Sequence, residues 1–570
     1  MKLYASGAEI AALEAALDAA ASGEARAAPL VALAWQLRQR DNTRALQLSA
    51  EAQPLLADKP DLRARDALTR SEILALRCQL DEAEDLLAQA RRLLAEPGID
   101  PLTEGDALLT EGLVAKARGQ RERELEAYER SAAFFFALGE KKDAQQRHEI
   151  AQAWHAYENA FSAPESTDAA EPVVARPEGD PASEALRDAA WGLALSRRHP
   201  ARAAELFLRA AELARQVGMV RHAVVCTMNA GSALQGLGEF DRAAACYESA
   251  AAVARQTGWP ALIGSAQTRL GAFLQELGLL EEARSVLSSA LDTLAAAPAG
   301  INRANACSAL AVTLLSLGRG IEAVGPMSEA IRMYREAQST DNLAMNLLGM
   351  ARAQSAAGQP QAALASLEEA QALIERHGLS ALVVGVCLAR AEIHQRHAEL
   401  PAPPDMTLPN AALHFAEATL GEGLKIAHWK PPASLLVLLA DAWASAGDMA
   451  RAFDYARKAL VQKDQETAQK LSHPLALLLR DEGRGGAPSR TMSELGAPAS
   501  PAAKLLTPKE GEILQLLARN YSNKEIATAL EMGEETVKWH LKKVFSKLEA
   551  GSRKHAVTRA RSLGVISFSS

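Results

Sequence analysis

The stretch that decides the fold is GSALQGLGEFDRAAACYESA, residues 231–250, because its small residues recur along the chain at a fixed interval. Its glycine Gly238 returns 40 residues later as Gly278, and again as Gly318 and Gly358. Alanines follow each of these glycines by five and by twelve residues, and a glycine or alanine precedes each by seven. This period predicts an array of two-helix units, in which the glycine makes the turn and the other small residues let two antiparallel helices pack closely.

A similar spacing extends in both directions, although the turn position there is not always glycine. It passes through Arg198, Gly119, Cys78 and Arg40 toward the N-terminus and reaches Gly447 toward the C-terminus. Breaks between units are expected half a period on, at Gly218, Gly258 and Gly378. The pattern predicts about ten or eleven helix pairs. Since no segment alternates apolar and polar residues over a strand's length, the predicted fold class is all-α.

The composition narrows the class of protein. The 570 residues are 48% hydrophobic, 23% charged and only 4% aromatic, which is typical of a globular chain rich in small residues. No apolar run is long enough for a membrane span or a signal peptide, so a cytoplasmic protein without a membrane partner is expected. The five cysteines lack metal-ligand spacing, each is expected to lie within an apolar helix, and all are expected to be reduced core residues. No catalytic cluster is recognisable, so neither an enzyme nor a cofactor nor a metal site is expected.

A second kind of segment lies near the C-terminal end. Residues 505–566 read LLTPKEGEILQLLARNYSNKEIATALEMGEETVKWHLKKVFSKLEAGSRKHAVTRARSLGVI. Thr507 and Ser522 are N-caps of two predicted helices, and Gly533 precedes a third, from Glu534 to about Leu548. The apolar spacing of that third helix puts its valines inward and its lysines outward, so the segment is predicted to be a helix-turn-helix.

The charge of this segment differs from that of the rest of the chain. Residues 504–566 hold 12 lysines and arginines against 7 acidic residues, a net charge of +5, whereas the whole chain is at −8 and the remainder therefore at −13. A helix with long cationic side chains fits the major groove of DNA. The charge distribution thus favours one DNA-facing end on an acidic body. The alternative is a basic helical cap on the repeat array, with its lysines solvated.

The order of these motifs resembles the bacterial LuxR/GerE-type DNA-binding domain. The resemblance rests on Leu506-Thr507-Pro508-Lys509-Glu510, Ser522-Asn523-Lys524-Glu525-Ile526-Ala527, Thr536-Val537-Lys538-Trp539-His540 and Ser552-Arg553. It implies that the third helix enters the major groove and that a fourth, about Ser552 to Leu563, pairs two modules into a homodimer on double-stranded DNA. It departs from the usual pattern at Gly511, Gly533 and Glu549.

The resemblance also implies roles for individual residues. Those nearest the bases would be Lys538, Trp539 and Lys542. Those holding the DNA backbone would be Ser522, Asn523, Lys524, Thr536, His540 and Lys543. Trp539 has a second interpretation, in which its ring packs inside the domain instead of facing the bases.

The 40-residue pattern resembles a lengthened tetratricopeptide repeat. Combined with the C-terminal module, the layout is similar to the sensor and DNA-binding parts of the large MalT-like activators. Those activators carry a nucleotide-binding module, but no phosphate loop GxxxxGK[ST] occurs in this sequence, so ATP-driven assembly is not expected.

A curved repeat array presents a concave wall on which an effector can bind. The repeat frame puts on this wall the polar residues Gln235, Thr268, Gln275, Asn305, Ser308 and Arg352, with Ser232 and Glu276 beside them. An unknown small molecule or protein effector is expected there. The alternative is that these side chains are only solvated.

The predicted organisation has five parts. They are N-terminal repeats 1–161, a Pro- and acid-rich interruption 162–185, C-terminal repeats 186–482, a flexible linker 483–502 and the DNA-binding domain 503–570. The predicted function is a DNA-binding transcription regulator whose repeats sense a ligand or partner. The alternatives are a protein-interaction scaffold, or an antagonist of another regulator, with the terminal module used for dimerisation or docking.

Overall fold

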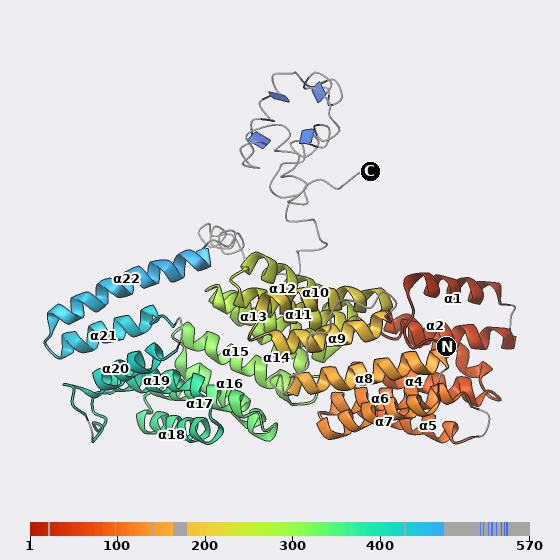
Figure 1. Ribbon diagram of the computed structural model, residues 1–570, viewed down its shortest axis with the longest axis horizontal. Coiled ribbons are helices and arrows are strands. Elements are labelled where there is room, and N and C mark those ends of the chain that lie inside the picture. Colours follow the sequence, from red (N-terminus) through yellow and green to blue (C-terminus); the bar gives the residue numbers. More distant parts are fainter. Residues whose placement is uncertain are drawn as a thin grey trace. The chain divides into compact units, whose positions relative to one another are not determined.

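The structure, a computed structural model, describes most of the repeat region and thirteen residues beyond it. The described residues are 1–20, 23–96, 99–139, 141–162, 179–404, 406–426 and 429–471, and then Ile513, Leu514, Leu517, Asn523, Ile526, Ala527, Leu530, Met532, Val537, Lys538, Leu541, Lys543 and Val544. The chain divides into two compact units, Met1–Asp481 and Glu482–Ser570. All regular secondary structure among the described residues is helical (Figure 1), which confirms the all-α prediction.

The first unit is a stack of 22 α-helices with three short 3-10 helices among its described residues, in line with the predicted number of pairs. Its first helices are α1 Gly7–Ala19, η1 Gly23–Arg26, α2 Ala27–Leu37, α3 Asn42–Ala52, η2 Gln53–Leu55, α4 Pro60–Leu76, α5 Leu80–Leu94, α6 Pro101–Arg118, α7 Arg121–Ala137 and α8 Lys142–Ser162. The following ones are α9 Pro181–Leu195, α10 Pro200–Val217, α11 Val220–Gly236, α12 Phe240–Thr257, α13 Pro260–Glu276, α14 Leu280–Leu294 and α15 Ile301–Ser316. The last are α16 Gly320–Glu336, α17 Thr340–Ala356, α18 Pro360–His377, η3 Ser380–Leu382, α19 Val383–Arg396, α20 Ala411–Leu424, α21 Ala433–Ser445 and α22 Met449–Leu471. Consecutive helices pack on each other, and alternate helices such as α4 and α6 also touch.

The predicted turn glycines lie where the first helix of a pair ends. Gly238 has φ +75°, a left-handed conformation that costs L-residues with a side chain about 1–2 kcal/mol. The next residue, Glu239, donates its N–H to the carbonyl of Leu234 at 3.0 Å, which closes the six-residue turn of a Schellman motif. The same bond recurs after Gly278 and Gly318, so the glycine period marks a repeated helix C-cap.

Two turns adopt this conformation without glycine. Cys78, in the frame of the turn glycines, has φ +63°, and Gln338, half a period after Gly318, has φ +53°. The turn therefore keeps the same backbone conformation at positions where the sequence has no glycine. Cys78 is also half-buried in the turn between α4 and α5, so the expectation that every cysteine lies within a helix is wrong for this residue.

Two glycines at the end of α11 offer a matched test of this turn. A Cβ built on Gly236 or on Gly238 meets no atom within 4 Å, but only Gly238 has a positive φ. We expect Gly238→Ala to lower the free energy of unfolding by about 1–2 kcal/mol and Gly236→Ala to raise it by about 0.5 kcal/mol. Chemical unfolding followed by circular dichroism measures both. Equal effects of the two substitutions would contradict a backbone origin.

Small residues allow the close approach that the sequence predicts within each pair. A Cβ on Gly231 would lie 2.9 Å from the ring of Tyr247, and one on Gly271 would lie 2.6 Å from Leu287. Both partners are buried and stand nine residues after the turn glycine. The position seven residues before the turn is therefore small because a large residue of the second helix packs onto it.

Turns far apart in the sequence also meet within the first unit. After α2, the guanidinium of Arg40 donates to the carbonyl of Gln216 at 2.8 Å, and the side chain of Asn42 donates to the carbonyl of Thr257 at 2.8 Å. These bonds join the turn after α2 to the ends of α10 and α12. The coiling of the array thus brings its first helices against its middle.

The predicted interruption falls largely on residues 163–178, which lie outside the described residues. On either side of it α8 and α9 pack together, and the His222 ring of α11 lies 5.5 Å from Trp154 and 4.9 Å from Tyr157 of α8. The apolar packing therefore continues across the predicted boundary, while the division into two lobes stays a prediction.

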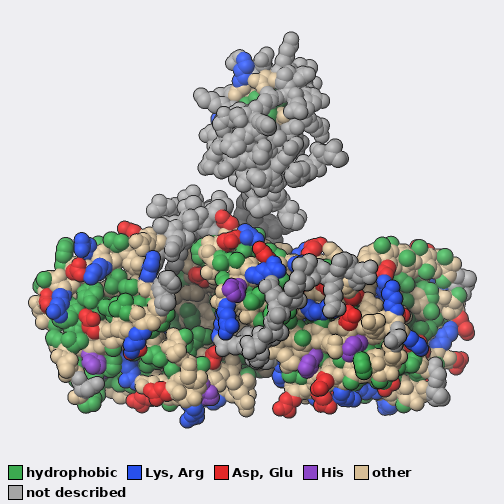
Figure 2. Space-filling model, in the orientation of Figure 1, with side chains coloured by type: hydrophobic (Ala, Val, Ile, Leu, Met, Phe, Trp, Pro, Cys, Tyr) green, Lys and Arg blue, Asp and Glu red, His purple; other side chains and the backbone are tan. Residues whose placement is uncertain are grey.

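At the other end, α21 and α22 expose apolar side chains (Figure 2). Val437, Phe453 and Leu460 are 48%, 73% and 66% exposed. No further helix pair among the described residues covers them.

Candidate nucleic-acid interface and effector surface

The described residues of the second unit separate into an apolar and a cationic set. Val537, Leu541 and Val544 are helical and buried, whereas Lys538 and Lys543 are helical and exposed. Burial at i, i+4 and i+7 with lysines between is the pattern of an amphipathic helix. Ile513, Leu514, Leu517, Ile526 and Ala527 are also buried.

The structure describes three of the nine predicted DNA contacts. Lys538 and Lys543 are exposed and Asn523 is half-buried. Outside the described residues lie Ser522, Lys524, Thr536, Trp539, His540 and Lys542. Contact of any of the nine with DNA stays a prediction, and so do both interpretations of Trp539.

Several predicted effector residues of the first unit bond to one another across neighbouring helices. The Gln235 side-chain amide of α11 donates to Glu276 of α13, and the Tyr247 hydroxyl donates to Gln235 at 2.7 Å. The Tyr247 hydroxyl also lies 3.0 Å from that of Ser232. A ligand at this place must therefore compete with bonds between successive repeats.

The remaining predicted effector residues are similarly occupied or half-buried. Asn305 accepts a bond of 2.6 Å from the Tyr334 hydroxyl, and Arg352 of α17 pairs with Glu392 of α19 at 2.6 Å. Thr268 is buried and donates to the Gly264 carbonyl of its own helix at 2.7 Å. Gln275 and Ser308 are half-buried. Their role as ligand contacts stays a prediction.

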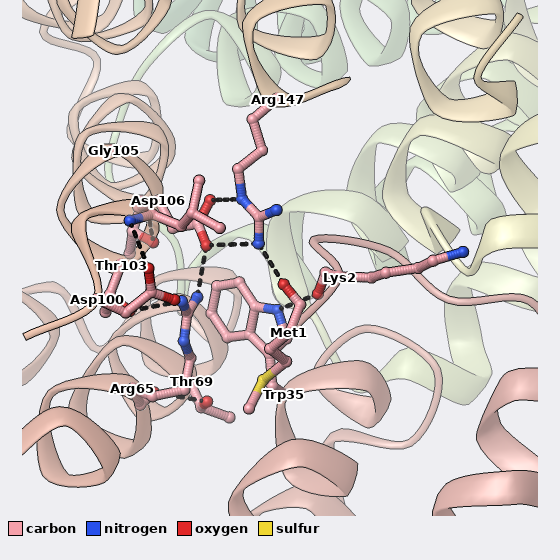
Figure 3. Close-up of polar contacts among 12 residues, drawn as sticks. Met1, Lys2, Trp35, Arg65, Thr69, Asp100, Thr103, Gly105, Asp106 and Arg147 are labelled. Atoms are coloured by element: carbon pink, nitrogen blue, oxygen red, sulfur yellow. Dashed lines mark hydrogen bonds and ion pairs between the residues drawn. The ribbon is translucent and has the colours of Figure 1, made fainter. Parts of the chain in front are cut away.

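Sequence reasoning missed a buried ionic cluster in the first repeats. The Asp106 carboxylate of α6 accepts bonds from Arg65 of α4 at 2.7 Å and from Arg147 of α8 at 2.9 Å (Figure 3). All three side chains are almost fully buried, at 0–4% exposure. Burial opposes ionisation, but the guanidiniums of Arg147 and Arg65 hold the pKa of Asp106 below its ordinary value. A signal was present in the sequence: these charges are spaced by 41 residues, one more than the 40-residue glycine period.

A second ionic group joins α6, α7 and α8. Lys116 pairs with Glu124 at 3.0 Å and also with Glu158, and Arg121 pairs with both carboxylates at 2.8 Å. Burial raises the pKa of Glu124, whereas Lys116 and Arg121 outweigh the burial of Glu158 and lower its pKa. The helices α6, α7 and α8 are thus tied together by charge as well as by apolar packing.

Several of the described histidines and cysteines take part in packing. His394 of α19 stacks on Phe415 at 5.2 Å, and His397 lies 3.0 Å from the Ser355 carbonyl. The five cysteines are unpaired, and Cys226, Cys246 and Cys307 are buried. In the described part of the chain, no cluster of three His, Cys, Asp or Glu side chains is arranged to hold a metal ion. Nor does any described helix combine the length and apolar character of a membrane span.

The fold and these surfaces define a helical-repeat protein, built from tetratricopeptide-like helix pairs, with a separate helical unit at the C-terminal end. Residues 504–560 of that unit match the family described as bacterial regulatory proteins, luxR family. A LuxR-type helix-turn-helix segment is therefore present.

Two relatives are transcriptional regulators. The HTH-type transcriptional regulator AlkS of Ectopseudomonas oleovorans is 28% identical over 173 residues, which cover 28% of this chain and 20% of that protein. The transcriptional regulatory protein ComA of Bacillus subtilis strain 168 is 42% identical over 62 residues, 11% of this chain and 29% of that protein. The chain thus matches less than a third of the length of either relative. Among solved structures, the apo form of RapI is similar, with a TM-score of 0.37 and 10% identity, over 70% of this chain and 98% of that one.

Proposed function

We propose that the chain is a DNA-binding transcription regulator in which the helical repeats sense an effector and control the C-terminal LuxR-type module. The observation that carries this proposal is the match of residues 504–560 to the luxR family. The exposed Lys538 and Lys543 beside the buried Val537 and Val544 support it, because DNA reading requires a cationic face on a helix whose other face is packed.

The proposal includes a mode of DNA binding. Two modules pair on double-stranded DNA and read half-sites about one helical turn apart. If about six phosphates are neutralised, the logarithm of affinity falls against that of salt concentration with a slope near −5. The effector is a small molecule or a protein that binds one state of the repeats more tightly than the other, and thereby shifts how often the modules meet DNA.

Two single substitutions distinguish base reading from backbone binding. The test first selects sites by binding the full chain to genomic fragments, and then measures affinity over a range of salt. We expect Lys538→Ala to reduce the preference for the selected site over random duplex by about 1–3 kcal/mol. Lys543→Ala is expected to weaken binding to all duplexes alike and to reduce the salt slope by about 1.

Lys430→Ala is the matched control, because it removes one exposed lysine from the first unit. It should leave both the site preference and the salt slope unchanged. No detectable duplex binding by the full chain, or a slope near zero, would contradict the proposal and favour the protein-interaction scaffold.

A further inference from the structure

The first five residues of the chain lie against the inner helices of the first repeats rather than in solvent. Residues 1–5 belong to no helix or strand, yet Leu3 and Ala5 are each only 4% exposed. In Figure 1 this end of the chain lies among α2, α4 and α8. A short segment without regular structure is thus seated where repeat arrays present their inner wall.

Side chains from separate helices bind the backbone of this segment. The Lys2 carbonyl accepts from Trp35 Nε1 at 3.1 Å and from Gln36 Nε2 at 2.7 Å, both on α2. Arg147 of α8 donates to the Met1 carbonyl, as Figure 3 shows. The Arg40 guanidinium donates to the Ala5 carbonyl at 2.8 Å. Carbonyl oxygens are offered by every peptide, so these four bonds do not select among side chains, and any selectivity must come from the buried Leu3.

The donors are held in place by the wall itself. Asp106 orients Arg147, and the guanidiniums of Arg38 and Arg65 lie 3.8 Å and 4.6 Å from the centre of the Trp35 ring. Trp35 and Arg147 are each 1% exposed. Without the segment these donors would keep their orientation and lose their acceptors, which is the property of a preorganised binding site.

The ends of the segment face solvent. Met1 is 40% exposed and the Lys2 side chain is 53% exposed, while Gly7 is exposed at the start of α1. Leu3 and Ala5 are anchored in apolar surroundings, and the half-buried Tyr4 packs against the same apolar cluster as Leu3. The segment can therefore leave the wall without unfolding a helix.

We propose that the inner wall of α2, α6 and α8 is a binding site for a short peptide with an apolar anchor residue, and that residues 1–5 occupy it as an intramolecular ligand. A peptide in solution exchanges with the segment by taking over its carbonyl bonds and the apolar contacts of Leu3. In the proposed regulator, this exchange is the step by which the repeats sense their effector. Peptide binding itself does not depend on the proposed function; only its effect on DNA binding does. Leu3 shares one apolar cluster with Ala107, Trp154 and Cys226. Departure of the segment therefore changes the packing of α6, α8 and α11.

The test uses the full chain and a synthetic hexapeptide, MKLYAS, with a fluorophore at its C-terminal end, and it measures anisotropy in the absence of DNA. Leu3→Asp places a charge in apolar surroundings and expels the segment. The segment competes at an effective concentration on the order of millimolar, so we expect Leu3→Asp to bind the hexapeptide about 10–100-fold more tightly than the parent chain does. Adding Gln36→Leu to Leu3→Asp should weaken binding by about 2–10-fold, because one bond to the Lys2 carbonyl is lost.

Three controls make the result decisive. The hexapeptide MKDYAS should not bind, and Ala12→Asp, which adds the same charge at an exposed position of α1, should bind like the parent. If Leu3→Asp does not fold by circular dichroism, Leu3→Ala replaces it and should give an intermediate affinity. A folded Leu3 variant that binds MKLYAS no better than the parent would overturn the proposal, whatever the DNA measurements show.

Discussion

Asp106→Asn is expected to lower the free energy of unfolding of the repeat unit by about 3–5 kcal/mol. The substitution keeps the shape of the side chain but removes the only carboxylate that bonds both Arg65 and Arg147 in this buried cluster. Two guanidiniums then remain in the interior with their positive charges uncompensated. Chemical unfolding followed by circular dichroism measures the loss.

The matched control is Asp81→Asn. Asp81 also pairs with an arginine, Arg118, but its side chain is 92% exposed, so solvent screens the pair. We expect the unfolding midpoint of Asp81→Asn to stay close to that of the parent. A midpoint for Asp106→Asn as high as that of Asp81→Asn would mean that the buried cluster does not hold α4, α6 and α8 together.

The repeat architecture was predictable because its turns and helix contacts require particular residue types at fixed positions. A left-handed cap favours glycine, and a packed pair of helices needs a small residue, so Gly238 and Gly231 record the backbone geometry directly. This signal is missing at turns that adopt the left-handed conformation without glycine. Cys78 and Gln338 adopt the same conformation without glycine, and only the period of the neighbouring repeats locates them.

The ionic cluster was harder to predict because charged residues are usually exposed. Arg65, Asp106 and Arg147 recur at an interval within one residue of the repeat period, but a sequence does not show that the same face of three helices is buried. The binding of residues 1–5 to the inner helices is even harder to predict from the sequence. Their contacts with Trp35 and Arg147 span 33 and 146 residues and use backbone carbonyls, which every residue type possesses.

The LuxR-type segment was recognised from a dense local motif, because caps and apolar spacing within about 60 residues define it. The polar residues predicted on the effector wall had no such support. Gln235 and Arg352 bond to the neighbouring repeats, and their sequence positions alone do not distinguish a bond between repeats from a bond to a ligand.

Acid is expected to destabilise the repeat unit through His222. Burial lowers the pKa of this imidazole from 6.5 to about 4, and the bond to the Ala185 carbonyl only partly opposes that shift. Between these values the unfolded chain binds a proton that the folded chain does not. The free energy of unfolding should therefore fall as the pH drops from about 6.5 to about 4, with about 3 kcal/mol of the loss due to this residue.

The variant His222→Asn isolates that contribution, because it removes the titrating group while an amide still reaches toward the carbonyl. Its stability should depend less on pH than that of the parent over this window, whereas His377→Asn, which removes an exposed histidine, should retain the parent's loss. Asp106 contributes at lower pH, since its pKa lies below its ordinary value of 3.8, and the two effects are therefore separable. Parallel curves for the parent and His222→Asn between pH 6.5 and 4 would show that the ring packed against Trp154 and Tyr157 is not kept neutral by its burial.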